Sequence, residues 1–414
     1  MMNKQEAIWL CQAASLLFNP NLKYMYNNKL ILLLSLAICL LSCKKDIDRA
    51  ETLTENTQLK KGLPLSSVYG NLKIEPLGMI TIEGGRNKEL KDFLDRAKQN
   101  TTTFLRDSSW TDGFSKIYQS DEMVVTPDNE SYVYPGSIIK SASVASGNFS
   151  PLKGYVKLPI DILASFPSDK AAGKIDTPSL SKTRVFLRNA LMDPFFSGRQ
   201  LEDFSYASSF FNSYEESKLS FGYNLNEKRL FSSVNSSFNS ANSRTSYSTG
   251  LILTYLVKNF TLAMPSDPVT GQLIDYTRTP SSVYEGVSPV YINSVTYGRF
   301  GFLMIETNSN SAATKTAFEK VVKKIFKKTT ETFTFEEESI FNSSRLTVYL
   351  MGSNGGAVTQ LINNPGSYDG LSNFISESLG EFTANDPGVP VQFSLKYLKD
   401  NSPYKPIFKV DYYY

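Results

Sequence analysis

Histidine is missing from the sequence altogether, since none of the 414 residues is a histidine. Its absence excludes the serine–histidine and cysteine–histidine pairs of common hydrolases, a histidine general base, and metal sites that need an imidazole ligand. The sequence also has no glycine-rich phosphate loop, no nucleophile elbow and no metal-ligand spacing. We therefore expect a protein that is not an enzyme and that uses neither a metal ion nor a cofactor.

The sequence also has few cysteines and a small net charge. The three cysteines, Cys11, Cys39 and Cys43, all lie within the first 43 residues. The rest of the chain therefore has no disulfide and no reactive thiol, and its stability must come from packing. The 43 basic and 40 acidic residues leave a net charge of only +3. So small an excess does not favour nucleic acid as a partner, and we expect none.

An apolar run at residues 30–41 is about a dozen residues long, which suits a signal peptide better than a bilayer-spanning helix. It ends in Leu40-Leu41-Ser42-Cys43, which resembles the bacterial lipobox. A buried helix is the alternative, but it leaves the charged Lys44-Lys45-Asp46 unexplained. We expect residues 1–43 to be a leader with lipid attached at Cys43, and residues 44–61 to be a flexible tether. Translation starts at either Met1 or Met25.

The remaining body, residues 62–414, has a composition that favours strands. It carries most of the 23 tyrosines and 27 phenylalanines, which are common in sheets. We expect a buried strand at 251–264, and further strands at 290–299, 300–307, 346–351 and 389–398. A short helix is expected at 183–192, and apolar residues at helical spacing predict an amphipathic helix at 312–328. The body is therefore expected to be of the α+β class.

Five short motifs follow one another in the order found in the thiol-activated, cholesterol-dependent cytolysins. The most recognisable runs from Ser288-Pro289-Val290-Tyr291 through Tyr297-Gly298-Arg299 to Ile305-Glu306-Thr307, and it resembles that family's core segment. The others are Tyr134-Pro135-Gly136, Leu158-Pro159-Ile160-Asp161-Ile162, Phe341-Asn342-Ser343-Ser344, and Asn385-Asp386-Pro387 with Tyr397-Leu398-Lys399-Asp400-Asn401. The resemblance covers residues 130–414, whereas residues 62–130 match poorly.

The resemblance implies a twisted antiparallel central β-sheet flanked by two helical clusters, as in the MACPF/CDC superfamily. The clusters correspond to residues 210–238 and 309–339. In the family such clusters unfold into two transmembrane hairpins per subunit, and many subunits close one β-barrel, which leaves no strand edge unpaired in lipid. The expected membrane-facing residues are Leu219, Phe221, Tyr223, Leu225, Leu230, Val234, Phe238, Phe318, Val322 and Phe326.

The two clusters differ in how well they alternate at the strand period. In the first, Leu219, Phe221, Tyr223 and Leu225 alternate with polar residues, as one face of a barrel strand requires, although an ordinary soluble hairpin fits the same pattern. In the second, Lys320 and Lys324 share a face with Phe318, Val322 and Phe326. Each lysine costs roughly 2–4 kcal/mol near the middle of a bilayer, so insertion of this segment is disfavoured unless a bulge shifts the register or the segment extends above the bilayer.

A hinge is expected where the family carries paired glycines. Here the sequence has Met351-Gly352. Paired glycines allow a covering edge strand to swing away, so that the next subunit can pair by strand addition. Gly352 retains part of that freedom, and Gly298 is expected to permit a tight step between two strands just before Arg299.

The family continues beyond the last motif into a fourth, β-sandwich domain with a tryptophan-rich, cholesterol-binding loop. The sequence stops at Tyr414, and its only tryptophans are Trp9 and Trp110. We therefore expect that the C-terminal β-sandwich domain is absent and that the protein does not bind cholesterol directly.

Two functions follow as hypotheses. The first is a pore-forming toxin subunit that self-oligomerises on a lipid membrane, with a longer cytolysin homologue supplying membrane recognition. As an exported lipoprotein it would sit on the outer membrane or cell surface until release, and Lys44-Lys45-Asp46-Ile47-Asp48 loosely resembles the export signal of Bacteroidetes surface lipoproteins. The second is a non-lytic surface lipoprotein, acting as an adhesin, decoy or immunity factor. The lysines of 312–328 and Met351 favour this alternative.

Overall fold

The computed structural model describes most of the body of the chain: residues 65–77, 79–86, 102–145, 148–196, 203–214, 216, 219, 246–268, 272–327, 332–352, 360–363 and 382–414. The chain divides into two units, residues 1–61 and 62–414, and everything described below belongs to the second. The predictions for the leader, for the tether and for lipidation at Cys43 lie outside the described residues.

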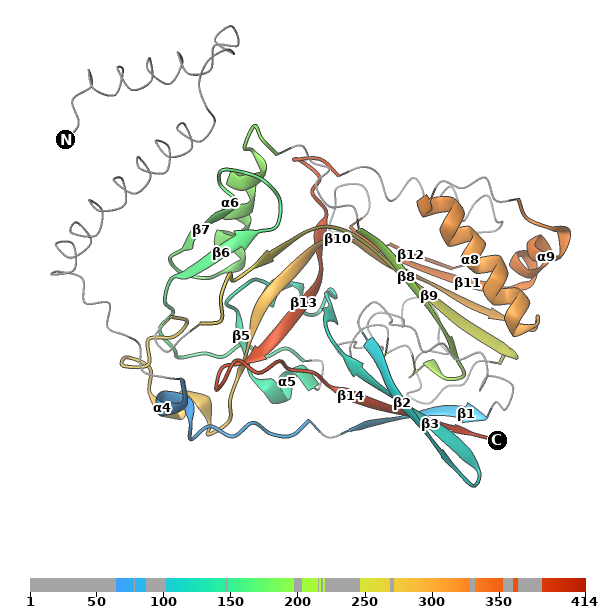
Figure 1. The fold of residues 1–414 in the computed structure, drawn as a ribbon, viewed down its shortest axis with the longest axis horizontal. Coiled ribbons are helices and arrows are strands. Elements are labelled where there is room, and N and C mark those ends of the chain that lie inside the picture. The colour runs from blue at the N-terminus through green and yellow to red at the C-terminus, as the bar shows by residue number, and fades with distance from the viewer. Residues whose placement is uncertain are drawn as a thin grey trace, which may run out of the picture. The chain divides into compact units, whose positions relative to one another are not determined.

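A long strand, β10 (Val290–Thr307), is the axis of the larger sheet. On one side it pairs antiparallel with β9, whose outer edge carries β8. On the other side it pairs first with β13 and then with β11, and β12 covers the outer edge of β11 (Figure 1). The bounds of these neighbours are β8 (Asp203–Phe211), β9 (Thr249–Ala263), β11 (Arg345–Met351), β12 (Gln360–Asn363) and β13 (Val389–Tyr397).

The apolar runs of β9 and β10 form strands that are buried on both faces. Most residues of β9 and all but two residues of β10 are buried, which explains why neither sequence alternates cleanly between apolar and polar residues. The predicted buried strand at 251–264 is confirmed by β9. The prediction of two strands, at 290–299 and 300–307, is wrong, because β10 is continuous. A register shift beside Gly298 absorbs the irregularity without ending the strand.

A second, four-stranded sheet has the order β1-β14-β3-β2. The strand nearest the C-terminus, β14, lies inside it, parallel to β1 and antiparallel to β3. Phe408, Val410 and Tyr412 alternate on the buried face of β14. The sequence did not predict this sheet, since residues 62–130 carry no strong motif. Its strands are β1 (Ile80–Arg86), β2 (Thr102–Trp110), β3 (Gly113–Ser120) and β14 (Ile407–Tyr413).

Short strands and helices lie around the part of the larger sheet that contains β13 (Figure 1). The helix α6 (Leu180–Leu191) confirms the helix predicted at 183–192 and begins earlier, because the Ser179 side chain caps it by accepting a hydrogen bond from the Lys182 amide. The other small elements are α4 (Leu65–Tyr69), β4 (Met123–Val124), η2 (Glu130–Tyr132), β5 (Ile138–Ile139), α5 (Ser141–Ala145), β6 (Ile160–Ala164), β7 (Ala172–Ile175) and η5 (Ser281–Tyr284).

Two helices follow β10 and precede β11. The first, α8 (Ser311–Lys327), confirms the amphipathic helix predicted at 312–328. The second, α9 (Phe335–Ser343), begins with a capping box in which Thr334 and Glu337 exchange side-chain and backbone hydrogen bonds. Across the described part of the chain, no helix has the length and apolar character needed to cross a bilayer.

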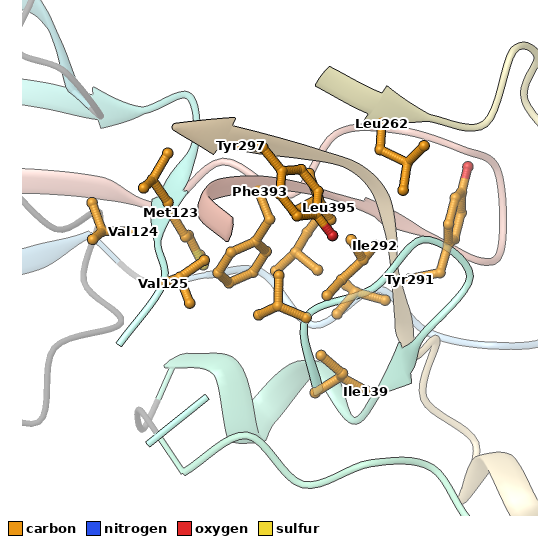
Figure 2. Packing of buried hydrophobic residues seen from close by; sticks show 14 of the residues in the cluster. Met123, Val124, Val125, Ile139, Leu262, Tyr291, Ile292, Tyr297, Phe393 and Leu395 are labelled. Carbon is orange, nitrogen blue, oxygen red and sulfur yellow. The ribbon is translucent and has the colours of Figure 1, made fainter. Parts of the chain in front are cut away.

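Buried side chains form two large clusters. One gathers the side chains of β10, β13 and the β4 segment, including Ile292, Phe393 and Met123 (Figure 2). The other joins strands β9, β10 and β11 to helices α8 and α9 and to β14. In this second cluster the rings of Phe318 on α8 and Phe341 on α9 lie 4.4 Å apart. The two helices are therefore held to the sheet by apolar contact.

We predict that Phe341→Ala lowers the free energy of unfolding by about 3–5 kcal/mol, because it empties a fully packed site in this cluster. The matched control is Phe335→Ala in the same helix, whose ring is 88% exposed, and a change within about 0.5 kcal/mol is expected for it. Urea denaturation measures both. Equal effects of the two substitutions would contradict the assigned packing of α9.

Candidate functional site

The strand β10 changes its pairing partner at one point. Gly298 pairs with Val389 of β13, whereas Phe300, two residues later, pairs with Met351 of β11. The ladder with β9 also shifts register between Tyr297 and Gly298. At this point the sheet divides into two branches, and β13 and β11 leave it at different ends of β10 (Figure 1). We call this point the hinge; it comprises residues 297–299, 351–352 and 386–389.

Three glycines bring backbones together at the hinge. A Cβ atom on Gly298 would lie 2.1 Å from the carbonyl oxygen of Val257 on β9. Gly352 and Gly388 both have positive φ, at 82° and 84°, and Cβ atoms there would lie 2.9 and 2.6 Å from the Gly298 carbonyl oxygen. At each of these three positions, a side chain would clash with the neighbouring backbone, so only glycine fits. The sequence predicted roles for Gly298 and Gly352 but missed Gly388, although Pro387-Gly388 is a turn signal.

Arg299 joins the two branches and is only 2% exposed. Its Nε donates to the carbonyl oxygen of Gly352 at 3.0 Å, just after β11. Its Nη2 lies 2.8 Å from Oδ2 of Asp386, just before β13. The guanidinium also lies over the ring of Phe382, 4.3 Å from its centroid. The expected strand-to-strand step before Arg299 is therefore wrong, because Arg299 fixes a junction of three strands within a continuous β10.

Tyr297 and Met351 fill the space beside this junction. The ring of Tyr297 stacks on Phe260 of β9 at a centroid distance of 4.9 Å. Burial raises the pKa of the Tyr297 hydroxyl above its ordinary value. Met351, the last residue of β11, is buried in the same apolar cluster. A side chain thus occupies a position where the resemblance led us to expect glycine, and it adds packing to the closed hinge.

A second buried polar group lies at the far end of β10. Glu306, 1% exposed, accepts a hydrogen bond from the Tyr214 hydroxyl at 2.6 Å and pairs with Nη2 of Arg345 at 2.7 Å. We call Tyr214, Glu306 and Arg345 the latch, because they join the segment after β8 to β10 and β11. The sequence indicated Glu306 only as part of a motif. Its partners lie far away in the chain, and no local pattern indicates them.

The same segment is also bound to the four-stranded sheet. Glu216 accepts hydrogen bonds from the amides of Asn212 and Ser213 and from the hydroxyl of Tyr412 on β14, the last at 3.1 Å. Burial, together with the charge of Glu216, raises the pKa of the Tyr412 hydroxyl well above its ordinary value. The start of the first candidate membrane segment is therefore attached to both sheets by buried hydrogen bonds.

The predicted membrane-facing residues fall into two groups in the structure. Leu219, Phe318 and Val322 are buried in the cluster that contains α8 and α9. Phe326 lies in the last turn of α8. Phe210 and Phe211, at the start of the range 210–238, end β8. The remaining candidates lie outside the described residues: Phe221, Tyr223, Leu225, Leu230, Val234 and Phe238.

Lysines on α8 pair with acidic residues in this state. Nζ of Lys320 lies 2.6 Å from Oε1 of Glu337 on α9, and Lys315 and Glu319 approach to 4.0 Å one turn apart. Such partly exposed pairs contribute at most about 1 kcal/mol each. Lys320, which a strand conformation would turn toward lipid, thus connects the two helices here.

The outer edge of β11 is covered by a short strand. β12 pairs with Thr347–Leu350, from Leu350 opposite Gln360 to Thr347 opposite Asn363. If β12 left, these backbone N–H and C=O groups would be exposed as a template for another strand. Gly352 follows the last residue of β11 and has a positive φ, so the chain can turn away from the sheet at this residue.

We predict that Arg299→Met lowers the free energy of unfolding by about 3–5 kcal/mol, because Asp386 and the Gly352 carbonyl lose their partner. Arg299→Lys should lie between this variant and the wild type, since it keeps the charge but not the forked geometry. Urea denaturation provides the measurement. If both variants came within 1 kcal/mol of the wild type, Arg299 would not join the branches as described.

For the latch, we predict that Tyr214→Phe lowers the free energy of unfolding by about 1.5–3 kcal/mol, the value of a hydrogen bond to a charged acceptor. The matched control is Tyr413→Phe, which removes a hydroxyl from a tyrosine that is 38% exposed. Thermal and urea unfolding of both variants test the difference. A Tyr214→Phe variant as stable as the control variant would show that the Tyr214 hydroxyl does not stabilise the latch.

The sequence is similar to that of a known protein family. A family model described as thiol-activated cytolysin matches residues 114–412. Pneumolysin from Streptococcus pneumoniae serotype 4 is 24% identical over 294 residues, which are 68% of this chain and 60% of that protein. Perfringolysin O from Clostridium perfringens strain 13 is 23% identical over 404 residues, 93% of this chain and 75% of that protein. The matched part thus spans about three fifths of pneumolysin.

Solved structures agree with the fold. Wild-type pneumolysin superposes with a TM-score of 0.62 at 20% identity, over 84% of this chain and 73% of that one. The human-specific toxin intermedilysin gives 0.60 at 19% identity, over 84% and 73%. The predicted α+β class, with its antiparallel central sheet, is confirmed. Because the family model matches residues 114–412, which are well over half of the chain and include the hinge and the latch, the chain belongs to the thiol-activated cytolysin family.

Proposed function

We propose that this chain is a pore-forming toxin subunit that oligomerises into a membrane β-barrel. One observation carries the proposal. Residues 212–248 connect β8 to β9, and residues 308–344 connect β10 to β11. Both connections join antiparallel neighbours of one sheet and have the same length. If each straightened, it would extend its two strands into a hairpin without changing any existing pairing.

The length of the two connections suits this change. A membrane strand needs about 9–11 residues, so two strands and a turn use little more than 20 residues. Each connection is longer than that, and the surplus allows residues near the sheet to remain above the hydrocarbon. The apolar side chains that the closed state buries, such as Leu219, Phe318 and Val322, would then face lipid. One set of apolar residues therefore serves both states.

The cost of the second hairpin lies in its lysines. Lys320 would have to leave Glu337, and Lys320 and Lys324 would share a face with Phe318 and Val322. Each lysine would cost roughly 2–4 kcal/mol at the bilayer midplane and close to nothing near its interfaces. We infer that this part of the segment lies near an interface in the pore.

Ring assembly needs two free strand edges on each subunit. Among the described strands, β8 and β12 form the two outer edges of the sheet beside α8. We propose that β12 leaves β11 by rotation at Gly352, so that the exposed edge of β11 pairs with β8 of the next subunit. Such head-to-tail contacts generate a ring when their rotation closes.

Membrane recognition and export form the less direct part of the proposal. We propose that residues 1–43 are a leader, that Cys43 carries lipid, and that residues 44–61 tether the body to the outer membrane or cell surface before release. We also propose that a longer homologue is the partner that recognises the target-cell membrane.

A non-lytic surface lipoprotein is the second candidate. The buried side chain of Met351 at the hinge and the Lys320–Glu337 pair both favour the closed state. In this alternative the fold serves as an adhesin, decoy or immunity factor and does not open.

Engineered disulfides test the proposal. The hydroxyls of Thr249 on β9 and Ser311 on α8 lie 3.1 Å apart, so the pair Thr249→Cys/Ser311→Cys would fix the start of α8 to the sheet. Extension of β10 would move residue 311 four positions beyond Thr307, the partner of Thr249, a displacement of about 13 Å that the crosslink forbids. We expect the oxidised variant to release no dye from phosphatidylcholine–cholesterol vesicles and to regain release after reduction.

The matched control is Ser294→Cys/Ser394→Cys, which links β10 to β13 where the hydroxyls lie 2.6 Å apart and no movement is proposed. Its oxidised form should release dye like the wild type. Each protein is measured alone and mixed with a longer homologue. Leakage by the oxidised Thr249–Ser311 variant would refute the refolding of residues 308–344. No leakage by the wild type in any mixture would support the non-lytic alternative.

A further inference from the structure

A cavity of about 420 Å³ lies beside the hinge, between α6 and the junction of β10, β11 and β13. Its size falls within the range of about 300–1,000 Å³ that is common for small-molecule sites. Tyr297, Met351 and Gly388 form the wall on the hinge side. Nothing in the proposed pore mechanism uses this space.

Three leucines form the apolar part of the wall on the helix side. Leu180, Leu187 and Leu191 line it from α6, and because they are spaced by seven and four residues they lie along one stripe of the helix. Val389 and Pro390 of β13 contribute apolar surface on the opposite side. The interior therefore suits an alkyl chain better than a sugar or a nucleotide, which would need polar partners on all sides.

Two arginines interrupt the leucine stripe. Arg184 and Arg188 line the same cavity one helical turn apart, and both side chains are exposed. Within the described part of the chain, neither guanidinium forms an ion pair or a hydrogen bond. Arg184 acts electrostatically on the Tyr297 hydroxyl, whose pKa burial raises and the arginine charge lowers. The positive charge therefore reaches the hinge wall of the cavity.

One acidic residue, Glu130, also lines the cavity. Against the two guanidinium groups it leaves an excess of one positive charge. Guanidinium groups bind carboxylates through paired hydrogen bonds, and two of them one turn apart can hold a single anionic head group. A site with an apolar interior and cationic groups that have no protein partner selects an amphiphile with a negative head.

We propose that this cavity binds a single-chain amphiphile of the fatty-acid class, with its alkyl chain between α6 and the hinge and its carboxylate at Arg184 and Arg188. The bound chain would touch Tyr297, Met351 and Gly388, the residues that border the junction. Binding itself is independent of pore formation. Its effect on opening rests on the proposed function: a ligand that fits only the closed hinge stabilises that state.

Calorimetric titration of the full chain with laurate, below its micelle concentration and without vesicles, tests the site. We expect saturable binding with one molecule per chain. Dodecyltrimethylammonium, which has the same chain length and a positive head, should bind at least about tenfold more weakly. Arg184→Gln/Arg188→Gln should weaken laurate binding by a similar factor. The matched control Lys174→Gln/Lys182→Gln removes the same charge from exposed positions and should bind laurate like the wild type.

A third variant, Leu180→Trp, places a bulkier side chain in the cavity. It should reduce laurate binding whatever the head-group contacts contribute. Circular dichroism and the unfolding temperature establish that each variant is folded. Equal affinity for the two head groups, or equal effects of the arginine and lysine substitutions, would overturn the proposal. So would the absence of saturable laurate binding to the wild type. None of these results depends on leakage, so failure here leaves the pore proposal standing, and the reverse also holds.

Discussion

The buried guanidinium of Arg299 is the interaction on which the rest of the architecture depends. A strand of eighteen residues, β10, has two different neighbours on one side, and the ends of those neighbours must meet somewhere along it. Arg299 binds the end of β11 through Gly352 and the start of β13 through Asp386. Because a buried charge is costly without partners, the arginine holds both ends in place and makes the junction specific.

The region beyond this junction must satisfy two opposing demands. In the closed state, α8 buries Phe318 and Val322 against the sheet, and the latch fixes the segment after β8. In the proposed open state, the same residues would leave the core. Apolar burial alone therefore cannot favour the closed state, since lipid would stabilise the same side chains to a similar extent in the open state. The hydrogen bond from Tyr214 to Glu306 would be lost in the proposed open state, so it favours the closed state over the open one.

Local periodicity predicted the parts of this fold that depend on local residues. The helix at 312–328 and the strand at 251–264 were found because their apolar spacing is set by near neighbours. The division of β10 was predicted wrongly, since Gly298 reads as a break and only the bulge against β9 shows that the strand continues. Glu306, Tyr214 and Arg345 were not recognised as a group, and the four-stranded sheet was missed, because both depend on pairing across long stretches of chain.

The position of β14 has a consequence for how the protein is made. Strand β3, near the start of the body, pairs with residues 407–413, so the smaller sheet cannot be completed until these residues have left the ribosome. Tyr412, which holds Glu216, arrives equally late. Pairings between such distant segments form slowly. Until these residues are made, β1 and β3 lack the strand that joins them, so the smaller sheet is expected to form late in folding.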